Sequence, residues 1–144
     1  MAKSFLNSWA TRTGEVVLVL AAAVLMVFSA VVHLHLWDNT YRHVASLGPL
    51  FLVQAVAALI GAALLAMTRL VLIMLGSVLL MVGTMVGFAL GATVGLLGFT
   101  LPQVTVWADV AVGSELLSTV ALIVVLAEQA RAAGRIGPAV RGPA

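Results

Sequence analysis

The sequence predicts an all-α fold, a four-helix transmembrane bundle. The chain has 144 residues, of which 63% are hydrophobic and only 8% are charged, and its mean hydropathy is +1.22. A soluble domain carries about 25% charged residues, so this composition cannot cover a water-facing surface. The apolar residues also gather into four runs, each close to the ~20 residues that a helix needs to cross a bilayer core.

The four expected spans cover residues 15–37, 48–67, 70–97 and 110–128. They form a transmembrane domain over residues 15–130, which follows a cytoplasmic N-terminal segment (1–14) and precedes a flexible basic cytoplasmic tail (131–144). Only Met67, Thr68 and Arg69 connect the second span to the third. A connection this short requires the two helices to form an antiparallel hairpin.

The basic residues predict the orientation of these spans. If both termini are cytoplasmic, six basic residues lie on the inner side and only Arg42 lies outside. The six are Lys3, Arg12, Arg69, Arg131, Arg135 and Arg141. Positive residues concentrate on the cytoplasmic side of membrane proteins. We therefore expect a multi-pass plasma-membrane protein, N-in and C-in, with the connections at 38–47 and 98–109 facing outward.

A glycine ladder marks the third span. Gly83, Gly87, Gly91 and Gly95 recur every fourth residue, which places them on nearly one face of a helix. Glycine weakens a helix in water, but small residues in a membrane allow two helix backbones to pack closely. The ladder thus predicts a helix-packing face. Its partner is either another helix of this chain or a second subunit.

Four polar residues of the spans fall at one depth. His33, His35, Gln54 and Glu115 all lie in the outer third of the membrane when the rise per residue is ~1.5 Å. His35 points roughly opposite to His33, because two residues rotate a helix by ~200°. A carboxylate inside a span is costly unless it finds a partner. We expect Glu115 to face the interior and to contact a histidine of the first span, with Gln54 or Ser118 nearby.

No catalytic residue is predicted, because the chain has no P-loop, H-E-x-x-H or G-x-S-x-G motif. Cysteine is absent, so no thiolate can act as metal ligand or nucleophile. The residues that could bind a metal ion are His33, His35, His43, Asp38 and Glu115, provided that their helices converge. Haem b needs axial ligands on both sides of its ring, and all three histidines belong to one segment, so one bundle cannot easily hold a haem between two helices, whereas a dimer could. We expect no cofactor, with haem b and a metal ion as open alternatives.

Part of the sequence carries a resemblance. The segment HLHLW at 33–37, with YRH at 41–43 and LGPLFLVQ at 47–54, resembles an uncharacterised actinobacterial family of four-span integral membrane proteins. The similarity is concentrated in the first two spans. It implies a fold and a lineage, and it transfers no catalytic residue to this chain.

These observations predict a small integral membrane accessory or structural subunit, which packs through the glycine ladder and presents the outward polar cluster. One alternative is a homo-oligomeric proton- or cation-coupled transporter that uses Glu115 and the histidines. A further alternative is a redox subunit that binds haem or a quinone. The expected partners are membrane lipid and either another membrane protein or a second copy. The few scattered basic residues do not form a nucleic-acid-binding patch.

Overall fold

The structure is a computed structural model that describes residues 2–96 and 105–135, with side chains from residue 12 to 96 and from 105 to 134. Its elements are helices only: α1 (Ala2–Leu36), the π-helical turn η1 (Trp37–Tyr41), α2 (Leu47–Thr68), α3 (Val71–Thr93) and α4 (Val106–Arg135). Four of them are long and apolar enough to cross a membrane. The predicted all-α class and the multi-pass membrane character are therefore confirmed at this level.

The helices differ from the predicted spans at their ends. α1 begins at Ala2, so the expected N-terminal segment continues the first helix. Residues 38–41, expected in a connection, form the turn η1 together with Trp37. α4 extends beyond the predicted span in both directions, from Val106 to Arg135. Membrane helices commonly extend past the apolar core, and hydropathy marks only the part that lies within it.

α3 ends earlier than predicted, at Thr93 rather than near residue 97. The amide groups of Val94 and Gly95 both donate to the carbonyl oxygen of Leu90, at 3.1 and 2.8 Å. Gly95 has a φ of 89°, a left-handed conformation that glycine adopts at little cost and that ends many helices. The prediction that Gly95 shares a helix face with the other ladder glycines is therefore wrong.

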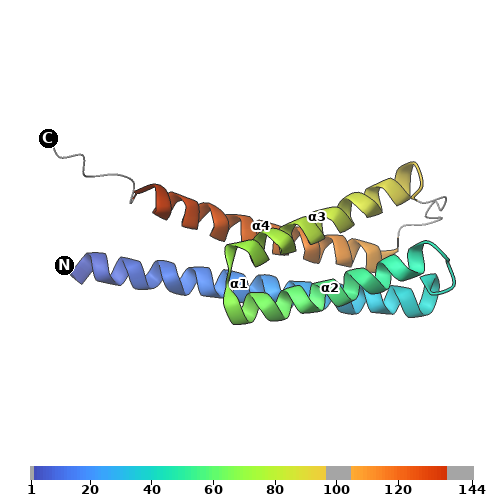
Figure 1. Ribbon diagram of the computed structural model, residues 1–144, viewed down its shortest axis with the longest axis horizontal. Coiled ribbons are helices and arrows are strands. Elements are labelled where there is room, and N and C mark those ends of the chain that lie inside the picture. Colours follow the sequence, from blue (N-terminus) through green and yellow to red (C-terminus); the bar gives the residue numbers. More distant parts are fainter. Residues whose placement is uncertain (1, 97–104, 136–144) are drawn as a thin grey trace, which may run out of the picture.

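The four helices lie side by side, as Figure 1 shows. α1 packs along α2 and α4, while α3 packs against α4 and, less extensively, against α2. Small side chains are prominent in the buried core, among them Ala22, Ala30, Ala55, Ala58 and Ala62. Close packing of small residues is the usual way in which membrane helices associate. In this chain it occurs around α1.

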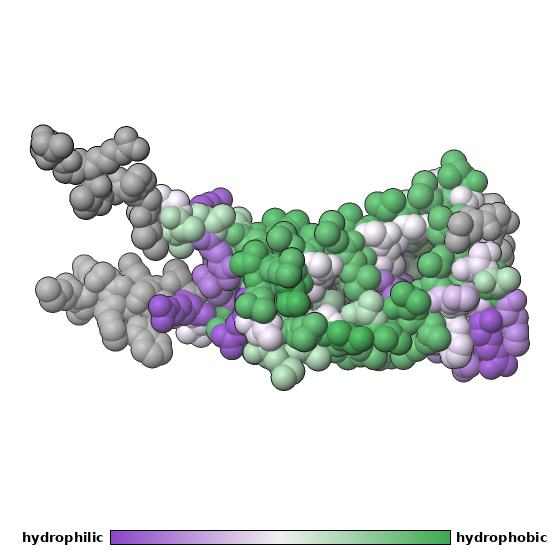
Figure 2. Space-filling model, viewed as in Figure 1, coloured by the Kyte–Doolittle hydropathy of each residue, from purple (hydrophilic) through white to green (hydrophobic). Residues whose placement is uncertain are grey.

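Large apolar side chains are exposed on all four helices, and Figure 2 shows them as a green band between purple, hydrophilic ends. We call these ends the Tyr41 end and the Arg69 end. The Tyr41 end contains η1 and the start of α4, and the Arg69 end contains the turn between α2 and α3. A continuous apolar belt of this kind suits contact with lipid.

Candidate functional site

A cavity of about 340 Å³ lies in the half of the molecule nearer the Tyr41 end. All four helices contribute to its wall, and α2 and α3 contribute most of the lining. α3 leans away from α2 toward this end (Figure 1), and Figure 2 shows a hollow between them with hydrophilic surface inside. The volume falls in the range of small-molecule sites, roughly 300–1,000 Å³.

The mouth of this cavity faces the surface that lipid would cover. Leu50 and Val53 of α2 and Leu79 of α3 line the cavity and are also exposed, Leu79 to 72%. These side chains belong to the apolar belt. A molecule dissolved in the bilayer could therefore enter between α2 and α3 without crossing water.

The polar end of the cavity is built around Glu115, which is only 1% exposed. Ser29 Oγ of α1 donates a hydrogen bond of 2.9 Å to Glu115 Oε1. His33 Nε2 lies 3.8 Å from the same oxygen, too far for a direct hydrogen bond. One helical turn of α1 thus supplies both groups that face the carboxyl group of α4.

The second ring nitrogen of His33 is held by its own helix. His33 Nδ1 lies 2.9 Å from the carbonyl oxygen of Ser29, and a carbonyl oxygen can only accept a hydrogen bond, so Nδ1 carries the hydrogen. A neutral His33 then presents a bare Nε2 to Glu115. The two facing atoms are both acceptors unless one proton resides on Nε2 or on the carboxyl group. At 3.8 Å the two groups face each other across the contact of α1 and α4 without a direct hydrogen bond.

These hydrogen bonds run differently from those of a nucleophilic triad. In such a triad the serine hydroxyl donates to the imidazole, and the carboxylate accepts from its other nitrogen. Here Ser29 Oγ donates to Glu115, and His33 Nδ1 donates to a backbone carbonyl. The arrangement positions a carboxyl group and does not activate a serine.

Gln54 of α2 forms another part of the polar end. Its side chain lines the cavity and is 8% exposed. Within the described part of the chain, the buried Gln54 Nε2 has no hydrogen-bond partner. An unpaired buried donor costs about 1–3 kcal/mol, so a group that accepts a hydrogen bond from Gln54 would be stabilised in this cavity.

Of the remaining cavity walls, one contains a pair of aromatic rings and another contains three glycines. Phe51 of α2 stacks on Tyr41 with ring centroids 4.6 Å apart and an angle of 21°, and it contacts the His33 ring at 5.4 Å. From α3, Gly83, Gly87 and Gly91 line the same cavity. The cavity therefore combines a stacked aromatic pair with a wall of α3 in which three positions have no side chain.

Two of the glycines predicted to pack against a helix, Gly83 and Gly87, border space instead. A Cβ atom added at Gly83 would meet no described atom within 4 Å, and one at Gly87 would meet only the Leu96 side chain, at 3.8 Å. No helix backbone of the described chain covers these two positions. The physical reason is the lean of α3, which keeps its glycine face away from α2.

The structure unites three of the four predicted polar residues. His33, Gln54 and Glu115 share the cavity, and the expected contact of Glu115 with a first-span histidine is made by His33. His35 lies apart: its Nδ1 is 3.2 Å from Asn39 Nδ2 and its ring is 4.8 Å from that of Trp107. Including His35 in the cluster was wrong, because it occupies the opposite face of α1.

Two serines differ from what the sequence predicted. Ser118 is not beside Glu115 in the cavity wall, since its Oγ donates to the carbonyl oxygen of Ala22 at 3.3 Å. Ser29 was not predicted, although its position four residues before His33 places it on the same helix face. That spacing is the signal that could have identified it.

The proposed metal ligands do not converge. Among the residues with described side chains, no three His, Cys, Asp or Glu residues are placed to hold one metal ion. Asp38 and His43 instead contact Arg42, at 3.3 Å from its Nη1 and 2.9 Å from its Nε respectively. Of the five residues, His33 and Glu115 share the cavity, Asp38 and His43 lie at Arg42, and His35 lies apart from both groups.

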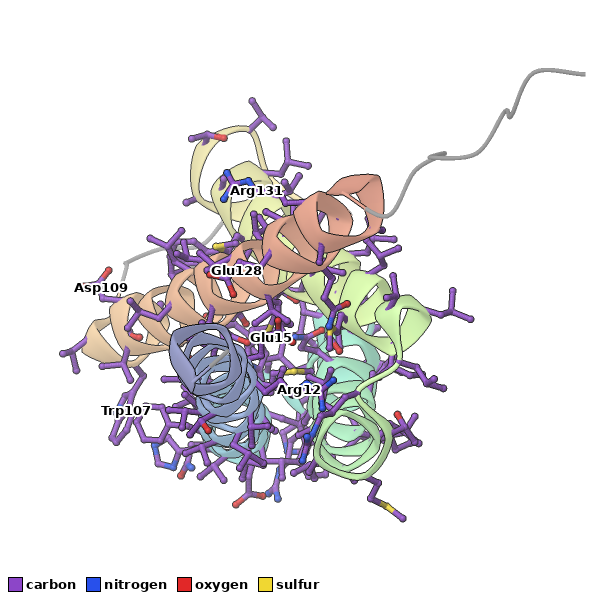
Figure 3. All side chains as sticks on the ribbon, turned by 90° about the vertical axis from the view of Figure 1, so that its left-hand side faces the viewer. Arg12, Glu15, Trp107, Asp109, Glu128 and Arg131 are labelled. Carbon is purple, nitrogen blue, oxygen red and sulfur yellow. The ribbon has the colours of Figure 1, made fainter. Side chains whose placement is uncertain are left out.

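A smaller cavity of about 140 Å³ lies at the Arg69 end. Arg12, Glu15, Arg69 and Gln129 contribute polar groups to it. Figure 3 looks onto this end and shows Glu15 and Glu128 between α1 and α4, with Arg12 on the side of α1 toward α2 and α3. The smaller cavity contains both positive and negative groups. Such a mixture suits contact with water rather than binding of a ligand with one charge.

The site and fold define a multi-pass helical protein with a cavity that opens toward its apolar belt. No family model matches the chain, and no curated protein or solved structure matches it either.

Proposed function

We propose that this chain is an integral membrane binding protein that takes a lipid-soluble ligand from the bilayer into the α2–α3 cavity. The observation that carries the proposal is the cavity itself, with its exposed apolar mouth and its buried polar end at His33, Gln54 and Glu115. Ligand sites combine apolar walls with a few convergent polar groups in this way. In this proposal both termini are cytoplasmic, as the basic residues predict.

Gly83→Leu tests this function directly. Gly83 lines the cavity and an added Cβ would meet no described atom within 4 Å, so we expect the leucine side chain to occupy cavity space. Gly76 is the matched control, because it lies on the same helix, is equally free around Cβ and does not line the cavity. Both substitutions replace glycine with a better helix former.

Native mass spectrometry of gently extracted protein provides the measurement. We expect a reproducible extra mass on the unmodified protein and on Gly76→Leu, and its loss from Gly83→Leu. An extra mass that persists in both variants would place the ligand elsewhere. A protein that carries no extra mass after extraction from its own membrane would contradict the proposal.

A second candidate is the accessory subunit predicted from the glycine ladder, with another membrane protein seated against α3. The uncovered face at Gly83 and Gly87 favours it. The chain contains no cysteine, so a single Leu79→Cys substitution places one thiol at the exposed edge of that face. Efficient cross-linking to one partner of fixed mass, blocked by Gly83→Leu and not by Gly76→Leu, would favour the subunit over the ligand-binding protein.

A further inference from the structure

We propose that the α2–α3 cavity binds the ring of a quinone, a planar, uncharged, lipid-soluble molecule that carries ring carbonyl groups. This inference rests on the proposed function, because it names the chemical class of the ligand for the same cavity. It follows from the shape of the walls, the unpaired donor, the charge of the site and the position of the mouth.

The walls favour a flat molecule. The stacked rings of Phe51 and Tyr41 form one side of the cavity. On α3, Gly83, Gly87 and Gly91 add three positions without a Cβ, beside Thr84 and Phe88. A ring can pack by its face against an aromatic pair, and backbone can approach it closely where there is no Cβ.

The volume agrees with a ring system and the start of a chain. An apolar cavity of about 150 Å³ is large enough to bind benzene. The cavity described here has about 340 Å³, which leaves room for a second ring or for the first segment of a tail. A longer tail can leave between Leu50, Val53 and Leu79, whose exposed side chains border the lipid.

The hydrogen-bonding groups favour a neutral acceptor. Gln54 Nε2 is a buried donor that lacks a partner among the described residues, and a ring carbonyl can accept its hydrogen. A fatty acid would place its carboxyl group beside that of Glu115, which is buried and already accepts from Ser29. An amine could pair with Glu115 but would leave the Gln54 donor unpaired. A quinone satisfies Gln54 without adding charge.

The test uses Gln54→Leu, with Gln129→Leu as its matched control. Gln129 is a partly buried glutamine at the Arg69 end and lines the smaller cavity. Gln54→Leu removes a buried unpaired donor, so the variant should fold at least as well as the unmodified protein. The probe is a naphthoquinone with a decyl chain, and decanol is the control for partitioning of the chain alone.

Binding is measured by equilibrium titration of the protein in nanodiscs, with empty nanodiscs subtracted. We expect saturable binding of the naphthoquinone, about 3- to 10-fold weaker binding to Gln54→Leu, and unchanged binding to Gln129→Leu. Gly83→Leu should abolish binding, and decanol should not compete. Equal binding to all variants, or competition by decanol, would overturn the quinone assignment.

The two proposals can fail separately. If the extra mass found by native mass spectrometry is lost in Gly83→Leu while the naphthoquinone does not bind, the ligand-binding function stands and the quinone class is wrong. If neither the extra mass nor the probe depends on Gly83, both proposals fail.

Discussion

The contact between α1 and α4 and the gap between α2 and α3 use the same kind of residue with opposite results. Across α1 and α4, Ser118 Oγ reaches the carbonyl oxygen of Ala22 at 3.3 Å, and Ser29 bonds to Glu115 at 2.9 Å. Across α2 and α3, the face at Gly83 and Gly87 stays open. A small residue permits close approach, but it closes a contact only where the residues on the opposite helix are small as well.

The residues opposite each face explain this difference. Ser118 is met by Ala22 and lies in a fully buried region. The glycines of α3 share their cavity with Phe51 and Leu50 of α2, and Phe51 is held in place by its stacking on Tyr41. We infer that the bulky side chains of α2 keep that helix at a distance from the glycine face of α3.

A large side chain added at the α1–α4 contact and on the glycine face of α3 should give the largest difference in stability. Ser118→Leu inserts a large side chain where α1 and α4 touch, and overpacking of this kind costs about 1–3 kcal/mol, occasionally more. We expect its helical signal to be lost at clearly lower denaturant in an SDS titration followed by circular dichroism. Gly83→Leu should unfold no earlier than the unmodified protein.

Gly113→Leu provides the same-helix control for that experiment, since a Cβ at Gly113 would meet no described atom within 4 Å. If Ser118→Leu were as stable as Gly113→Leu, the α1–α4 contact would not be the close-packed one.

The hydrogen bond across the tight contact should have the next largest effect. Ser29→Ala leaves the buried Glu115 without its hydroxyl donor, and a buried acceptor that loses its partner costs about 1–3 kcal/mol. Ser114→Ala should cost less, because the Ser114 hydroxyl donates only to the carbonyl oxygen of Ala111 on its own helix. The free energies of unfolding of both variants provide the test.

A double-mutant cycle with Glu115→Leu identifies the cause of that loss. When both partners are replaced by apolar groups, no unpaired polar group remains, so Ser29→Ala should have little further effect in the Glu115→Leu background. Additive losses would show that Ser29 acts through packing rather than through the carboxyl group.

The smallest effect is expected at the Tyr41 end, outside both regions. Asp38 and Arg42 form an ion pair of 3.3 Å with both side chains more than half exposed, and such a pair contributes at most about 1 kcal/mol. Asp38→Asn should therefore change the free energy of unfolding by less than about 0.5 kcal/mol. A change as large as that of Ser29→Ala would mean that the turn η1 depends on this pair.

The sequence was sufficient for the helices and for part of the site. Hydropathy located the four spans, and the cost of burying a carboxylate predicted that Glu115 would meet a histidine of the first span, which proved to be His33. The ion pair of Asp38 and Arg42 also follows from their four-residue spacing on a helix. Each of these follows from the period of one helix or from the chemistry of one residue.

The cavity could not be predicted in the same way. The repeat of Gly83, Gly87 and Gly91 defines a helix face, but the lean of α3 decides whether anything covers it. That lean depends on side chains of other helices, such as Phe51 and Tyr41, which meet only in the folded protein. The prediction that His35 joins the polar cluster was wrong because it relied on depth in the membrane. His35 has the same depth as His33 but lies on the opposite face of the helix.

The position of Glu115 also has a consequence for the order of assembly. Chains are made from the N-terminus and fold progressively as they emerge, and Ser29 precedes Glu115 by 86 residues. The corner formed by His33, Tyr41 and Phe51 uses residues of α1, η1 and α2 alone, so it can form before α4 is synthesised. When α4 is inserted, the Ser29 hydroxyl is already in place to donate to Glu115. The carboxyl group therefore spends little time in the bilayer without a hydrogen-bond partner.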